Sequence, residues 1–190
     1  MILYLHGFRS SPQSYKARLL AQELQQRQQT HLWQCPQLPA SPAAAIALCH
    51  QLIQTHGTAE LCIIGSSLGG YYASHLAQHY GSKAVLLNPV VHAARDLATQ
   101  AGSHQSYHSD TPFHFLPNYV QQLAHIVVPR PTKPELFYLL AAKGDEVLDW
   151  REMVDWYQHS HITLIEGSDH GLSDFPLYIQ DVLNYALPTS

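Results

Sequence analysis

The stretch that decides the fold is CIIGSSLGGYY, residues 62–72. Its apolar start leads directly into Gly-Ser-Ser-Leu-Gly-Gly, after which a helical pattern begins. Residues 65–69 match G-x-S-x-G, the pattern in which a serine stands on a tight turn between a buried strand and a helix. Glycines are needed two residues before and after that serine, because side chains there would collide with the neighbouring elements. Ser67 meets this requirement and Ser66 does not. The other interpretation is a plain turn of small residues without chemistry.

The rest of the chain alternates short apolar runs with helical patterns. The runs read as strands lie at residues 2–5, 31–34, 61–64, 84–87, 136–142 and 162–165. Such alternation predicts right-handed crossovers and a mostly parallel sheet of about six strands with helices on both faces, an α/β three-layer sandwich. The length of 190 residues, without repeats or a linker, predicts a single domain over 1–190.

One segment, residues 89–133, breaks this rhythm between two sheet strands. It is rich in proline, histidine and aromatic residues and shows no strong strand pattern. Because long connections without regular structure are uncommon in compact domains, we expect a short lid-like insertion rather than a separate domain. Helices are expected near residues 92–99 and 118–125.

The composition excludes several classes of function. The net charge is −4 and no long basic run occurs, so nucleic-acid binding is not expected. No apolar run reaches the length of a membrane span, and the first residues lack the pattern of a signal peptide, so a cytoplasmic protein without membrane contact is expected. The three cysteines lack zinc spacing, and the 14 histidines are scattered, so no metal or cofactor is predicted. His75 and His79, four residues apart, are read as a surface pair rather than as metal ligands.

A serine nucleophile needs a base, and in this kind of fold the order along the chain is serine, acid, histidine. His170 follows the last predicted strand in a glycine-flanked loop, and Asp145 follows the strand before it. We therefore expect both beside Ser67, at the carboxyl edge of the sheet. Three other acidic residues lie close in the sequence: Glu146, Asp149 and Asp169. Glu146 lies one position further from the strand end than Asp145. Asp149 fits a helix cap, and Asp169 shares a loop with His170.

An oxyanion formed by serine attack needs two hydrogen-bond donors. The amide of Leu68, directly after the nucleophile, is the natural first donor. The second is expected from the loop after the first strand, where the sequence reads LYLHGFRSSP over residues 3–12. Gly7 would allow a close approach there, so the amide of Phe8 is the predicted second donor.

Together these motifs resemble the α/β-hydrolase superfamily, and more closely the small bacterial esterases of the YqiA type. The matching stretches are LYLHGFRSSP (3–12), PQLP (36–39), IIGSSLGGYYA (63–73), NPV (88–90), KGDEVLDW (143–150) and IEGSDH (165–170). The resemblance implies carboxylester hydrolysis through an acyl-enzyme without a cofactor. By motif position it implies Ser67 as nucleophile, Asp145 as acid and His170 as base.

Two functional hypotheses follow. The first is a serine carboxylesterase or thioesterase that acts on small to medium acyl groups of a small-molecule substrate. Its substrate-binding residues are expected in the insertion: Phe113, Phe115 and Tyr119. The alternative is a catalytically idle protein of the same fold that only binds a partner. The sequence leaves the oligomeric state open.

Overall fold

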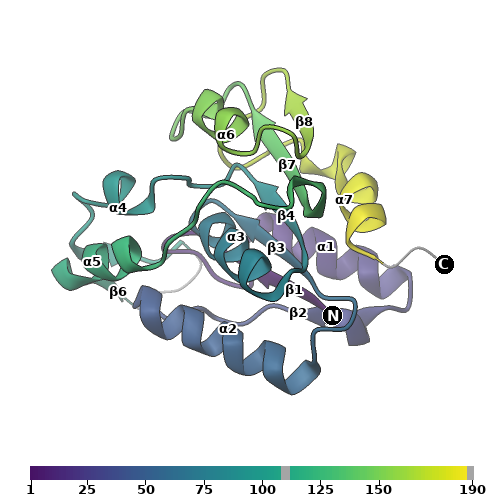
Figure 1. The fold of residues 1–190 in the computed structure, drawn as a ribbon, viewed down its shortest axis with the longest axis horizontal. Helices are drawn as coiled ribbons and strands as arrows, with labels where there is room; N and C mark the ends of the chain where they lie inside the picture. Colours follow the sequence, from purple (N-terminus) through teal and green to yellow (C-terminus); the bar gives the residue numbers. More distant parts are fainter. Residues whose placement is uncertain (108–111, 188–190) are drawn as a thin grey trace.

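The computed structural model describes residues 1–107 and 112–187. Six parallel strands form one sheet in the order β2-β1-β3-β4-β7-β8 (Figure 1). Their bounds are β1 Ile2–Leu5, β2 Trp33–Gln34, β3 Cys62–Ser66, β4 Lys83–Leu87, β7 Phe137–Ala142 and β8 His161–Ile165. The predicted α/β class and the sheet of six strands are thus confirmed.

Helices cover both faces of this sheet, as predicted. They are α1 Tyr15–Gln26, α2 Pro42–His56, α3 Leu68–Tyr80, α4 Ala93–Asp96, α5 Pro117–His125, α6 Trp150–Trp156 and α7 Ile179–Ala186. Short 3-10 turns occur at η1 Thr30–Leu32, η2 Pro134–Leu136 and η3 Phe175–Leu177. Two helices begin at sequence signals that could be recognised: Ser41 caps α2 before Pro42, and Asp149 caps α6.

Two apolar layers hold the sandwich together, one on each face of the sheet. Because successive strand residues point to opposite faces, each central strand supplies both layers. Leu3, Ile63 and Leu139 pack toward α2, α3 and α6, whereas Tyr4, Ile64 and Leu140 pack toward α1 and α7. Strands buried on both faces are continuously apolar, which explains why the sequence shows them as unbroken runs.

The insertion corrects one expectation. It holds an antiparallel hairpin, β5 Gly102–Gln105 and β6 Pro112–Phe115, where no strand was predicted. The residues of β5 are polar and mostly exposed, so they carry no alternating apolar signal. The expected helices are α4 and α5, and α4 is shorter than predicted. Residues 108–111 of the insertion lie outside the described part of the chain.

Register brings the candidate residues to one edge of the sheet. Gly65 in β3 is the partner of Leu5 in β1 and of Leu86 in β4. The carboxyl ends of these three strands therefore lie side by side. The turns that follow them open on the same side, which is where ligands bind in open parallel sheets.

Candidate active site

Ser67 stands on a strained turn between β3 and α3. Its backbone has φ 54° and ψ −121°, a conformation that side chains rarely adopt and that costs of order 1–3 kcal/mol. A Cβ added to Gly69 would lie 2.0 Å from the carbonyl oxygen of Leu5, and one added to Gly65 would lie 2.2 Å from that of Gly69. The two glycines of the motif are therefore required by backbone contact. The Ser67 amide donates to the Leu87 carbonyl at 3.1 Å, which fixes the turn.

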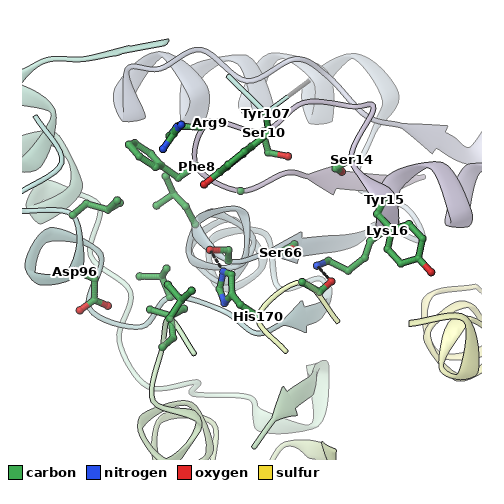
Figure 2. Close-up of a pocket in the computed structure, with 18 of the residues that line it drawn as sticks. Phe8, Arg9, Ser10, Ser14, Tyr15, Lys16, Ser66, Asp96, Tyr107 and His170 are labelled. Atoms are coloured by element: carbon green, nitrogen blue, oxygen red, sulfur yellow. Dashed lines mark hydrogen bonds between the residues drawn. The ribbon is translucent and has the colours of Figure 1, made fainter. Parts of the chain in front are cut away.

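The structure brings Ser67, His170 and Asp145 together, although the first two are 103 positions apart in the sequence. Figure 2 shows His170 at the cavity, where a dashed line marks its hydrogen bond to the serine. His170 Nε2 lies 3.0 Å from Ser67 Oγ, and its Nδ1 lies 2.8 Å from Asp145 Oδ2. The Asp145 side chain is fully buried, whereas that of His170 is 21% exposed. Because an ionised carboxylate only accepts, Nδ1 donates to Asp145 and Nε2 presents its lone pair to the serine hydroxyl.

The other oxygen of Asp145 is also satisfied. Oδ1 accepts hydrogen bonds from the amides of Val147 and Leu148, both at 2.8 Å. These two donors fix which oxygen of the carboxylate faces the imidazole. The short loop after β7 is therefore built around this carboxylate.

The rival acidic residues lie elsewhere. Asp149 accepts from the amide of Arg151 at 2.9 Å and caps α6, as expected. Glu146 accepts from the backbone amide of His170 at 3.0 Å, so it contacts the histidine loop without touching the ring. Asp169 accepts from the amide of Ser173 within its own loop.

Asn88 is a residue that sequence reasoning missed. It is fully buried with φ 43°, directly after β4. Its Oδ1 accepts from the amide of Ala142 at 2.8 Å, and its Nδ2 donates to the carbonyls of Asp169 and His170 at 3.0 and 3.1 Å. One amide side chain thus ties β4, β7 and the histidine loop together. The sequence signal was an asparagine at the end of a buried strand, before a proline.

The loop after β1 passes close to the serine. A Cβ on Gly7 would lie 3.2 Å from Ser67 Cβ and 3.7 Å from its Oγ, so a side chain there would press directly on the serine. The buried ring of His6 holds the loop in place: Nε2 accepts from the Leu38 amide at 3.0 Å, and Nδ1 lies 3.0 Å from the Gly7 carbonyl. Phe8 follows immediately and lines the cavity beside Ser67.

A cavity of about 460 Å³ opens over the serine, within the range of small-molecule sites. Its apolar wall includes Phe8, Leu68, Val90, Leu97 and Leu148, and its polar wall includes Tyr4, Ser14, Lys16 and Ser66.

The three aromatic residues predicted to bind substrate do not belong to this wall. Phe113 and Phe115 pack edge-on against Phe8, with ring centroids 5.1 and 5.2 Å away, and Tyr119 packs in turn against Phe115. Large apolar rings on the hairpin gain more by covering the core than by facing the open cavity, and Phe115 is 1% exposed. They support the cavity wall from behind.

Within the described residues, no group of three or more potential ligands is arranged to hold a metal ion. His75 and His79 do not share a ligand site: Nδ1 of His75 lies 3.0 Å from the Val127 carbonyl, and the ring of His79 contacts that of His50. Across 1–107 and 112–187, no helix has the length and apolarity needed to cross a membrane.

The strand order, the strained serine turn and the histidine loop define an α/β-hydrolase fold. The structure superimposes on Est1E from Butyrivibrio proteoclasticus, solved with ferulic acid bound, with a TM-score of 0.71 at 12% identity over 97% of this chain and 86% of that chain. Mouse alpha/beta hydrolase domain-containing protein 10 gives a TM-score of 0.65 at 16% identity, covering 96% and 89%. An esterase from Pyrococcus furiosus gives 0.64 at 13% identity, covering 97% and 80%. Because the sequence identities are this low, the three matches show a shared fold alone.

Residues 1–187 match the family described as "Uncharacterised protein family (UPF0227)", and the chain belongs to this family. The family spans the described chain from its first strand to the end of α7. The predicted α/β-hydrolase fold is confirmed by the structural matches.

Proposed function

We propose that the protein is a serine hydrolase that cleaves carboxylic esters of small to medium acyl groups. The observation that carries this proposal is the chain of contacts from Ser67 Oγ through His170 to Asp145, at 3.0 and 2.8 Å, beneath a cavity of about 460 Å³. Two structures of the same fold belong to esterases, and one of them holds a carboxylic acid, ferulic acid. Both support ester hydrolysis over the other reactions that this fold performs.

In the first half of the reaction, His170 Nε2 takes the proton of Ser67 as Oγ attacks the acyl carbon. Asp145 stabilises the imidazolium that forms and keeps its ring oriented. The amides of Phe8 and Leu68 stabilise the negative oxygen, one from the loop after β1 and one from the first residue of α3. His170 then protonates the leaving alcohol, and an acyl-enzyme remains.

Water completes the reaction by the same path. It enters where the alcohol left, gives a proton to His170 and attacks the acyl carbon. The carbon–Oγ bond breaks, and the proton returns from His170 to Ser67. The product is a free carboxylic acid, and no group outside the chain is needed for these steps.

The test is labelling with a fluorophosphonate probe, together with turnover of 4-nitrophenyl esters and matched thioesters of increasing chain length. Ser67→Ala should abolish labelling and lower turnover by several orders of magnitude. Ser74→Ala, which removes a buried hydroxyl from the same helix away from the cavity, is the matched control and should label normally. The thioester series decides between esterase and thioesterase.

Two outcomes contradict the proposal. If labelling and turnover survive Ser67→Ala, the nucleophile is another residue. If the parent protein shows neither, the fold serves binding without catalysis.

A further inference from the structure

The cavity over Ser67 has two chemically different sides. Figure 2 shows Ser14, Tyr15 and Lys16 grouped on one side of Ser66 and His170, with Asp96 on the opposite side. The carboxylate of Asp96 is paired with the guanidinium of Arg95 at 2.7 Å. The end of the cavity with Lys16 is therefore the one whose charge has to be accounted for.

Lys16 is a buried cation whose charge is not matched by an ion pair. Its residue exposure is 8%, and its Nζ donates to the carbonyl of Gly171 at 2.6 Å. Among residues 1–107 and 112–187, no carboxylate lies within ion-pair distance of Nζ. Burial lowers the pKa of Lys16 to about 8, although Asp169 and Asp145 partly oppose this. An ammonium has three donors, so two remain for another acceptor.

Two hydroxyl groups lie behind the cavity wall at the same end. The oxygens of Tyr4 and Ser14 are both buried, so a ligand in the cavity does not reach them. Burial raises the pKa of Tyr4, and the neighbouring hydroxyls of Ser14 and Ser66 counter part of this rise. Lys16 is therefore the polar group at this end that a ligand is expected to contact, because it lines the cavity.

The second cation of the cavity is already engaged. Arg9 donates twice to the carbonyl of Gln105, at 2.8 and 2.6 Å, and its guanidinium lies 4.7 Å from the ring centre of Tyr107. It therefore holds the hairpin to the loop after β1. Lys16 is left as the cation available to a ligand at the polar end.

The ammonium of Lys16 carries one positive charge, and one of its three donors is used by the Gly171 carbonyl. The complementary group accepts hydrogen bonds and carries one negative charge, which describes a carboxylate better than a doubly charged phosphate. We propose that Lys16 binds a carboxylate of the substrate at this end of the cavity. The inference rests on the proposed function: the ester that is cleaved carries a second, ionised carboxyl group.

The first test compares charged and neutral esters. Mono-4-nitrophenyl adipate and its methyl ester place the charge on the acyl side, and 4-acetoxybenzoate and its methyl ester place it on the alcohol side. The measured quantity is the ratio of kcat/KM for the charged over the neutral ester, which cancels any general effect of a variant on the histidine loop. Lys16→Met should lower this ratio about tenfold or more in at least one pair. Lys133→Met, at an exposed site, removes the same charge and should leave the ratio unchanged.

Tyr4→Phe and Ser14→Ala remove hydroxyls that lie out of reach of the cavity, so both should leave the charged-to-neutral ratio unchanged. If Lys16→Met changes the ratio in neither ester pair, the proposal is wrong.

A binding measurement tests the carboxylate site independently of the proposed hydrolysis. It can be made even if the protein turns over no ester. Adipate should raise the Tm of the parent protein above that in sodium chloride of equal ionic strength. The rise should disappear in Lys16→Met and persist in Lys133→Met. No rise with adipate, or a rise with inorganic phosphate alone, would overturn the assignment to a carboxylate.

Discussion

Replacing Asp145 with asparagine isolates one property of the site, the position of a single proton. In the structure, Oδ1 accepts from the amides of Val147 and Leu148, and Oδ2 accepts from His170 Nδ1. Asparagine has only one oxygen, and it must face the two amides. Its NH₂ group then faces Nδ1, which has to accept. The single proton of the neutral imidazole moves to Nε2, where it points at Ser67 and blocks proton abstraction.

The expected loss can be estimated from these contacts. The opposite orientation of the asparagine would set its NH₂ against two buried amides and lose two hydrogen bonds, at about 1–3 kcal/mol for each unsatisfied group. The unproductive tautomer is therefore strongly preferred. In the serine protease whose triad defines this arrangement, the same change lowers kcat by about 10⁴. We expect Asp145→Asn to lower kcat/KM by about 10³–10⁴, which corresponds to about 4–5 kcal/mol of transition-state stabilisation.

The assay is hydrolysis of 4-nitrophenyl butyrate, with ¹⁵N NMR of the imidazole to locate the proton. Asp149→Asn is the matched control, because asparagine caps a helix as well as aspartate does; its activity should stay within about threefold of the parent. A loss of less than tenfold in Asp145→Asn, or a proton still on Nδ1, would refute the reasoning. An equal loss in Asp149→Asn would assign the acid elsewhere.

Three further predictions concern stability and are measured by denaturant unfolding. Gly69→Ala should cost at least about 2 kcal/mol, because the added Cβ would meet backbone at 2.0 Å and the gain in helix propensity is only about 1 kcal/mol; Gly81→Ala, also at a backbone glycine but with open space around it, should cost less. Ser41→Ala removes the cap that accepts from Ala44 and should cost about 1 kcal/mol; no change would mean that the cap is redundant. The pKa of Lys16 is about 8 in the folded protein against 10.5 as the ordinary value, so between these two values the unfolded chain binds more protons and stability rises with pH. The parent should gain up to about 3 kcal/mol relative to Lys16→Met between pH 7 and 10, and parallel curves would contradict this.

The central sheet and the serine turn could be predicted because their signals are local. β7 is six residues long and buried throughout, so its pattern needs no tertiary information to be read as a strand. The glycines around Ser67 are fixed by contacts within one strand-turn-helix unit and its neighbour β1. The pairing of Asp145 and His170 also follows from topology, because parallel strands deliver their following loops to the same edge.

The hairpin and the cavity wall could not be predicted, because both depend on contacts between distant segments. β5 is polar, and its position depends on Arg9 and on the ring of His104, which lies 5.6 Å from that of Phe8. Phe113 and Phe115 are aromatic, but aromatic character alone does not tell a cavity wall from the layer behind it. Sequence reasoning assigned them to the substrate, whereas in the structure both rings pack against Phe8.

Lys16 shows most clearly why some features of the protein can be predicted from the sequence and others cannot. In the sequence it is one lysine near the start of an amphipathic helix, the kind of position where lysine is normally solvated. Only the approach of the loop after β8, through the Gly171 carbonyl, buries its ammonium. The motif around Ser67 can be recognised in the sequence because its strained turn requires glycines at fixed positions. A buried charge without an ion pair leaves no such mark, so substrate selectivity in this fold has to be read from the three-dimensional structure.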